Sequence, residues 1–401
     1  MIRKKNIRMA AAVLAAAGLV LSGNTGCSKS EDLSETVQDS GDPGTGDQSA
    51  DEMVRIAESY QDVYEQAVKE GEESSSQTAE KILECIGKLG YTAVDTDQSA
   101  DMVNHEAAEE FCLKAQTGEA AETTIFLLHD SGGLTRYDLH SHNGKLDVRE
   151  QSLSWADGEP EVSKAEEYEA VRWTYSNEEY LFFEKYYPDG YDGPSGNTAL
   201  RIKPLEKKYR EMNQKYIEPI GFEKNNMFIT EWDGSDFGAL DFYDLYDIMY
   251  FMKYGEYHPY VWTAEGTVYE IPAAEFEEVI LSYIDITREK LRERLDYNSG
   301  ADTYVYRPRG TADMRTVCDI PWPEVTGYEE NTDGTVTLRV KAVYMETEDA
   351  CAIESEVTVE PRADGTCRYV SCHVLSGKNK NNTDWYPERL TEEEWNEHYN
   401  R

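Results

Sequence analysis

The spacing of apolar residues predicts three helices in the first part of the chain. Apolar positions at three- and four-residue intervals predict a helix over 51–70. The same interval predicts a second helix that ends at Gly90 and, after a short strand over 91–94, a third helix over 100–116. Each of these helices has one apolar face, so we expect all three to pack against a common core.

The apolar period then changes from helical spacing to strict alternation. Alternating residues predict strands over 123–129, 135–142 and 145–155, with Asn143-Gly144 as a two-residue hairpin turn. A further hairpin is predicted over 168–175 and 179–187. Helices followed by an antiparallel meander predict an α+β fold, and this order of elements is similar to that of NTF2-like or cystatin-like domains.

A stretch rich in Gly, Pro and Asp, residues 186–197, predicts a boundary between a domain over 51–190 and a second α+β domain over 197–401. The polar tail after Ser376 is expected to lie over the surface. The elements predicted for this half are a helix over 203–216, a strand over 226–230, a buried helix over 240–254, a strand over 267–271, a helix from Pro272 to about Leu295, and a three-stranded antiparallel sheet over 335–345, 352–360 and 366–375.

The first 27 residues have the pattern of a lipoprotein-type signal peptide. Four cations precede an apolar run, Met9–Leu21, which is too short to span a membrane and leads into small residues. Cys27 follows Gly26 as in the lipobox of bacterial lipoproteins, although Asn24 departs from the usual leucine. We therefore predict export and a lipid anchor on Cys27. Ordinary cleavage near Gly23, which would release a free protein, is the alternative.

The segment that follows Cys27 predicts a tether. Residues 28–50 are rich in Ser, Gly and Asp and contain no aromatic residue, which is typical of a disordered linker. Such a linker would hold a folded body away from the outer face of the cytoplasmic membrane, in a Gram-positive-type cell envelope.

Composition narrows the classes of partner. The chain has 79 Asp and Glu against 39 Lys and Arg, a formal net charge of −40. A surface this acidic repels nucleic acid, so we expect no nucleic-acid partner. The 28 tyrosines and seven tryptophans are typical of core packing, and the alternative is a surface on which sugar rings stack.

The cysteines predict disulfide bonds. Six remain after Cys27, an even number in a chain that we expect to be exported. Cys85 and Cys112 would link two helices, and the other four allow three pairings. No C-x-x-C spacing is present to indicate a zinc ribbon. The four cysteines of the second half are Cys318, Cys351, Cys367 and Cys372.

Asp138, His140 and His142 form the sharpest candidate for a ligand site. Strand alternation places all three on one face, and two imidazoles with a carboxylate suit zinc, with His129 as a further neighbour. The alternative is that they form the solvated face of a half-buried sheet. A second set, Asp189, Asp192 and Asn197, loosely suggests calcium but lacks the spacing of an EF-hand, which favours a plain turn.

Evidence for catalysis is sparse. No G-x-S-x-G, H-E-x-x-H, Walker or G-x-G-x-x-G motif occurs, and 79 acidic residues make any carboxylate pair uninformative. Arg307, Arg309 and Arg315 follow Tyr304 and Tyr306 in an otherwise acidic chain. These arginines predict either an anion-binding edge or a turn in which they pair with local acids.

Several segments resemble an uncharacterised family of clostridial lipoproteins. The resemblance covers about 168–375, and its most specific part is the Ile-Pro-Ala…Phe-Glu-Glu-Val-Ile stretch. It implies lipid anchoring and supplies no activity, cofactor or catalytic residue. The segments that carry it are NNMFITEWDGSDFGALDFYDLYDIMYFMKYG, VYEIPAAEFEEVILSYIDI, YVYRPRGTADM, NTDGTVTLRVKAVY and VTVEPRADGTCRYVSCHVL.

These observations favour a non-enzymatic, lipid-anchored protein that binds an envelope protein or glycan. The first alternative is a secreted glycan-acting hydrolase that uses carboxylates. The second is a metal-binding protein built on Asp138, His140 and His142, with zinc or calcium as the ion.

Overall fold

The computed structural model describes residues 45–188, 190–191, 193, 195–314, 320–377 and 384–399. Several predicted features therefore lie outside the described residues. They are the signal peptide over 1–27 with Cys27, most of the tether, Asp189, Asp192, Arg315 and Cys318.

The first lobe, residues 45–202, is built on a six-stranded mixed sheet in the order β1-β2-β3-β4-β5, with β6 beside β4. β1 runs parallel to β2, and the other pairs are antiparallel. The predicted α+β order of helices followed by a meander is confirmed, while the likeness to NTF2-like or cystatin-like domains stays a prediction. The elements are α1 (Thr45–Glu70), α2 (Ser76–Lys88), β1 (Thr92–Asp95), α3 (Glu106–Gln116), β2 (Ala121–Leu128), β3 (Leu134–His142), β4 (Lys145–Ala156), β5 (Glu159–Val162), β6 (Glu166–Glu169), β7 (Trp173–Tyr175), β8 (Tyr180–Glu184) and β9 (Asn197–Arg201).

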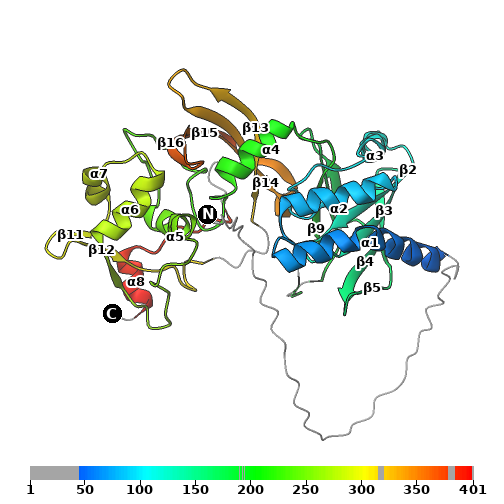
Figure 1. The fold of residues 1–401 in the computed structure, drawn as a ribbon, viewed down its shortest axis with the longest axis horizontal. Helices are drawn as coiled ribbons and strands as arrows, with labels where there is room; N and C mark the ends of the chain where they lie inside the picture. Colours follow the sequence, from blue (N-terminus) through cyan, green and yellow to red (C-terminus); the bar gives the residue numbers. More distant parts are fainter. Residues whose placement is uncertain are drawn as a thin grey trace, which may run out of the picture.

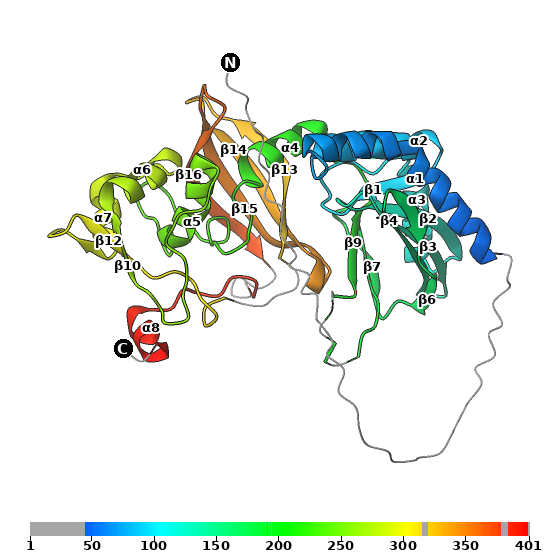
Figure 2. The same ribbon diagram turned by 60° about the horizontal axis from the view of Figure 1, so that its bottom comes forward.

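Both faces of this sheet are covered, because its strands alternate apolar side chains between two cores. On one face α1 and α2 pack over residues such as Phe126 and Leu134 (Figures 1 and 2). On the other, α3 and the small sheet β7-β8-β9 pack over residues such as Ile125 and Tyr137. The first lobe is thus a layered structure whose central sheet is buried over most of its length.

This layering corrects one prediction. Cys85 belongs to the core under α2, whereas Cys112 belongs to the core under α3, so the central sheet separates the two thiols. The predicted Cys85–Cys112 disulfide is wrong for this reason. The described cysteines with free thiols are Cys85, Cys112, Cys351, Cys367 and Cys372.

The second lobe, residues 203–399, combines helices with a four-stranded antiparallel sheet in the order β13-β14-β15-β16 and a three-stranded sheet, β10-β12-β11. The predicted three-stranded sheet is confirmed as β14, β15 and β16, with β13 as an added strand. The elements are α4 (Lys207–Met212), the π-helix η1 (Asn213–Ile217), α5 (Phe242–Tyr254), β10 (Tyr269–Pro272), α6 (Ala273–Tyr283), α7 (Arg288–Arg294), β11 (Tyr297–Asn298), β12 (Thr303–Tyr306), β13 (Trp322–Glu330), β14 (Val336–Tyr344), the 3-10 helix η2 (Met345–Thr347), β15 (Asp349–Pro361), β16 (Cys367–Gly377) and α8 (Glu392–His398).

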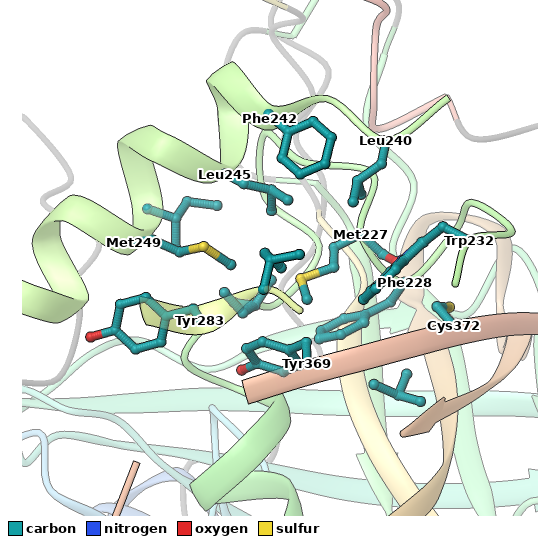
Figure 3. Close-up of a cluster of buried hydrophobic side chains, with 14 of the residues drawn as sticks. Met227, Phe228, Trp232, Leu240, Phe242, Leu245, Met249, Tyr283, Tyr369 and Cys372 are labelled. Atoms are coloured by element: carbon teal, nitrogen blue, oxygen red, sulfur yellow. The ribbon is translucent and has the colours of Figure 1, made fainter. Parts of the chain in front are cut away.

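One large apolar core holds the second lobe together. Figure 3 shows Leu245 and Met249 of α5 above Tyr369 and Cys372 of β16, with Phe228 between them. All five side chains are buried. This core explains why the segment over 240–254 is apolar on nearly every side, because α5 is packed against the lobe rather than laid on its surface.

Two predicted elements of this lobe are wrong. Residues 226–230 form turns instead of a strand, because the Asn225 and Asn226 side chains bond to nearby backbone groups. The helix predicted from Pro272 to Leu295 is interrupted after Tyr283. Ile284 bridges to β16 there, and Thr287 caps the new helix α7.

The C-terminal tail also differs from expectation. Trp385, Tyr386 and Trp395 are buried, so the described part of the tail, 384–399, packs into the second lobe. The Tyr386 hydroxyl donates to the Asp244 carboxylate at 2.8 Å. The tail is therefore part of the folded lobe.

A buried contact joins the lobes. Tyr180 and Phe182 of β8 pack against Val343 and Ala350 at one end of the four-stranded sheet. Beside them, the Arg201 guanidinium donates to both oxygens of Glu324 at 2.8–2.9 Å. Since β9 pairs with β8, the segment after the predicted boundary belongs structurally to the first lobe.

Candidate functional site

A cleft of about 1230 Å³ lies between the two lobes. The first lobe contributes the β2–β3 turn and the loop after β1. The second lobe contributes α4, η1 and the C-terminal end of α5, with the start of β13 beside them. Clefts at domain interfaces are a preferred place for ligand sites.

The β2–β3 turn forms a rigid polar wall. The Gly132 carbonyl accepts hydrogen bonds from the Tyr60 hydroxyl and the Trp155 indole, both at 2.8 Å. Gly132 has φ +72°, and a Cβ there would lie 2.6 Å from the Tyr64 ring. Glycine is therefore required at this position to place the neighbouring Asp130 at the cleft.

Asp130 and His129 have shifted protonation equilibria. Partial burial raises the pKa of Asp130, and a hydrogen bond from Ser74 opposes this shift. Burial lowers the pKa of His129, whose ring nitrogens lie 3.0 Å from Thr96 Oγ1 and 2.8 Å from Thr135 Oγ1. His129 is thus a neutral, hydrogen-bonded wall residue at pH 7.

The end of α5 forms an aromatic wall. Phe251 and Tyr254 line the cleft, and Tyr254 is 42% exposed. Gly255 ends the helix in the left-handed conformation, which turns the chain away and leaves these rings at the edge. Lys253 Nζ contacts Ser282 Oγ at 2.7 Å and Glu278 at 3.2 Å, and it also lies over the Tyr254 ring, 5.7 Å from the ring centroid.

The floor of the cleft is the buried pair that joins the lobes. Glu324 is 4% exposed and accepts from the Tyr180 hydroxyl at 2.8 Å as well as from Arg201. Burial raises the pKa of Glu324, and the Arg201 charge opposes that shift. The floor is fixed, so the cleft has a preformed shape.

Taken together, these walls suit a hydroxyl-rich organic ligand. Aromatic faces pack on the apolar face of a sugar ring, while carboxylate, amide and guanidinium groups bond to its hydroxyls. Asp97, Gln98, Arg210 and Gln214 line the cleft, and each of them already interacts with another group of the chain. This site could not be predicted from the sequence, since its residues come from separate segments that only the tertiary structure brings together.

The structure regroups the candidate metal ligands. His140 and His142 lie near Asp147 of β4, whereas Asp138 is engaged elsewhere. Asp138 accepts from Arg136 Nε at 2.8 Å, from Thr124 Oγ1 at 2.7 Å and from Arg149 Nη1 at 3.2 Å. His129 lies at the opposite end of the β2–β3 pair from His140, which pairs with Glu122.

The hairpin register explains the regrouping. The two-residue turn at Asn143-Gly144 fixes the pairing of β3 with β4, so Asp147 lies directly opposite His140. Counting outward from the turn in the sequence would have found this residue.

Arg309 of the 303–316 segment belongs to a buried ion cluster around Asp244. The Arg309 guanidinium donates to both oxygens of Asp244 at 2.7 Å, and Arg389 Nη2 donates to Asp244 at 2.7 Å. Arg307 pairs with Asp296 and Glu392. These arginines do pair with acids, but Asp244 and Glu392 are distant in sequence and are not the local acids that the prediction named.

The carboxylates of this cluster shift in opposite directions. Arg389 and Arg309 hold the pKa of Asp244 below its ordinary value despite burial. Burial, reinforced by the Asp244 charge, raises the pKa of Asp241 to about 6. Asp241, Asp244 and Asp247 of one helix face two guanidiniums, so the cluster carries one excess carboxylate.

The remaining predictions concern the N-terminus and calcium. Asp189 and Asp192 lie outside the described residues, and Asn197 begins β9. Among the described residues, no helix combines the length and apolar character needed to cross a membrane.

Comparison with known proteins gives one match. The model of a family of unknown function (DUF6070) matches residues 46–389, which includes both lobes and the cleft. No curated protein and no solved structure matches the chain.

Proposed function

Because the chain belongs to the DUF6070 family of unknown function, we propose from its own residues that it is an exported, lipid-anchored protein that binds envelope glycan in the inter-lobe cleft. The basic, apolar and small-residue stretches before Cys27 support export and anchoring. The resemblance to clostridial lipoproteins also supports export and lipid anchoring.

The observation that carries the binding role is the mixed lining of the cleft. Phe251 and Tyr254 line the cleft together with polar side chains such as Asp130 and Gln214. The buried Arg201–Glu324 floor keeps that space preformed, which lowers the entropic cost of binding. The acidic surface favours a neutral glycan over an anionic wall polymer.

The test measures binding of soluble, neutral wall-glycan fragments to the mature protein by calorimetry. We expect Tyr254→Ala to weaken binding about tenfold or more, because it removes one stacking face. Tyr186→Ala is the matched control, since Tyr186 is 69% exposed and is not among the cleft-lining residues. Absence of binding, or equal weakening by both variants, would contradict the glycan role.

The anchor is tested separately in producing cells. We expect Cys27→Ser to move the protein from the membrane fraction to the medium, because the thiol is the site of lipid attachment. A variant that stays membrane-bound would place the anchor elsewhere and leave the cleft proposal standing.

A second candidate function is glycan hydrolysis, and Asp130 favours it. A carboxyl group with a raised pKa at the edge of a cleft can act as a general acid. The assay is release of reducing ends from the same glycan fragments. Turnover that Asp130→Asn abolishes would establish the hydrolase, and binding without turnover would support the binding protein.

A further inference from the structure

The central sheet of the first lobe has an open region beyond α1. There the face is hollowed into a pocket of about 880 Å³ that is lined by residues of β2, β3, β4 and β6. Strand register places four side chains in one row across β2, β3, β4 and β6. The row consists of Glu122, His140, Asp147 and Glu169.

Within this row and its neighbour His142, three ligand atoms converge. One atom each from His140, His142 and Asp147 lies within 4.8 Å of the others. Asp147 Oδ2 is 3.8 Å from His140 Nδ1 and 3.5 Å from His142 Nδ1. Ligands at 2.0–2.1 Å from a tetrahedral zinc ion are separated by roughly 3.3 Å, so the present spacing needs only small side-chain adjustments to enclose one.

These atoms are close without being hydrogen-bonded. Both Nδ1 distances to Asp147 exceed the range of a normal hydrogen bond. His142 Nδ1 is buried and has no hydrogen-bond partner, although its side chain as a whole is 35% exposed. A buried nitrogen without a partner is unusual, and a bound cation would satisfy it.

The surrounding charges leave this trio available. In the next row Asp138 is neutralised by Arg136 and Arg149, which keeps both cations away from the imidazoles. The other nearby cation, Lys145, pairs with Glu169 at 2.7 Å. None of these described cationic side chains therefore occupies the space between His140, His142 and Asp147.

The hairpin also holds the trio in place. The His140 and His142 rings stack with centroids 5.3 Å apart, and Asp147 faces them across a two-residue turn. Ligands on paired strands are positioned more rigidly than ligands on loops. The cost of ordering the site is accordingly low.

We propose that His140, His142 and Asp147 form a transition-metal site that takes zinc with a fourth position open to the pocket. Two imidazoles with one carboxylate match the ligand preference of zinc and disfavour calcium and magnesium, which take oxygen ligands. Glu122, the register neighbour of His140, lines the pocket onto which the fourth position opens. The site is independent of the inter-lobe cleft.

The test is zinc titration of chelator-treated mature protein by calorimetry, with bound metal counted by elemental analysis after desalting. We expect one zinc per chain that excess calcium or magnesium does not displace. His140→Ala, His142→Ala and Asp147→Asn should each weaken binding about 100-fold. Asp138→Asn is the matched control and should bind as the parent does, because its partners are Arg136, Arg149 and Thr124.

Two outcomes of the titration would overturn the proposal, and a third comes from spectroscopy. Zinc-free parent protein after desalting is one, and equal zinc retention by the parent and the three ligand variants is the other. X-ray absorption at the zinc edge provides a readout that weak binding to surface acids cannot imitate, since it should show two imidazoles around the ion. A first shell made of oxygen alone would also contradict the site.

Discussion

Two polar clusters on opposite lobes handle their carboxylates in contrasting ways. Asp244 is 1% exposed, and each of its oxygens accepts from at least two donors. Asp147 has a side chain that is 47% exposed and lies near two imidazole nitrogens without bonding to either. The first arrangement is complete within the chain, and the second leaves positions for a ligand.

The contrast shows how a buried structural ion cluster is distinguished from a ligand-binding site. Arg309, Arg389 and Tyr386 come from segments far from α5, and together they saturate Asp244. A saturated carboxylate holds segments together and has no lone pair left for an incoming ion. The trio of His140, His142 and Asp147 on the central sheet can still accept an ion, and it contributes little to the stability of the fold.

Breaking the closed cluster should have the largest effect. Asp244→Asn leaves Arg309 and Arg389 buried with a deficit of negative charge, so we expect a loss of about 3–5 kcal/mol in the free energy of unfolding. Urea denaturation followed by tryptophan fluorescence measures it. A loss below 1 kcal/mol would show that the cluster is not what holds the tail to α5.

The excess carboxylate of the Asp244 cluster should make the free energy of unfolding depend on pH, with an effect of intermediate size. Burial raises the pKa of Asp241 from 3.8 to about 6, so the folded state binds a proton that the unfolded state has lost. The resulting stability is fully present below pH 3.8 and is lost as the pH rises through 6. The difference amounts to about 2–3 kcal/mol.

Asp241→Asn isolates this contribution, because asparagine caps a helix as well as aspartate does. We expect the variant to lose less stability than the parent between pH 5.0 and pH 7.5, measured by urea denaturation at both values. Parallel changes in the two proteins would mean that Asp241 titrates normally.

The open trio should give the smallest effect on stability. In metal-free protein, Asp147→Asn should change the free energy of unfolding by less than about 0.5 kcal/mol, because the residue is half exposed and makes only long contacts. The same denaturation assay applies. A loss comparable to that of Asp244→Asn would remove the distinction between the two clusters.

Local pattern was sufficient to predict most elements of the fold. Helical spacing located α1, α2 and α5, and alternation located β2, β3 and β4. It failed where side chains override the local pattern. At 226–230 two asparagines bond to the backbone, and after Tyr283 a contact with β16 interrupts a helix that the sequence would otherwise continue.

The candidate sites were harder to predict from the sequence than the fold was. Alternation correctly placed His140 and His142 on one face but chose Asp138 as their partner, because neighbours within a strand are visible in sequence and neighbours across a hairpin require the register. The cleft could not be predicted at all, since Phe251 and Asp130 meet only through the packing of two lobes.

The docked C-terminal tail has a consequence for the order in which the chain matures. Tyr386 and Arg389 are synthesised after Asp244 and Arg309, yet they complete the environment of the Asp244 carboxylate in the second lobe. Without Arg389, the guanidinium of Arg309 contacts Asp244, while His258 Nε2 and the Tyr306 hydroxyl contact Asp247 at 3.0 Å and 2.6 Å. The first lobe can fold as it emerges, whereas the second lobe needs the segment around 386–389 to complete this cluster. Proteolytic removal of the tail would therefore destabilise the second lobe and leave the first lobe folded.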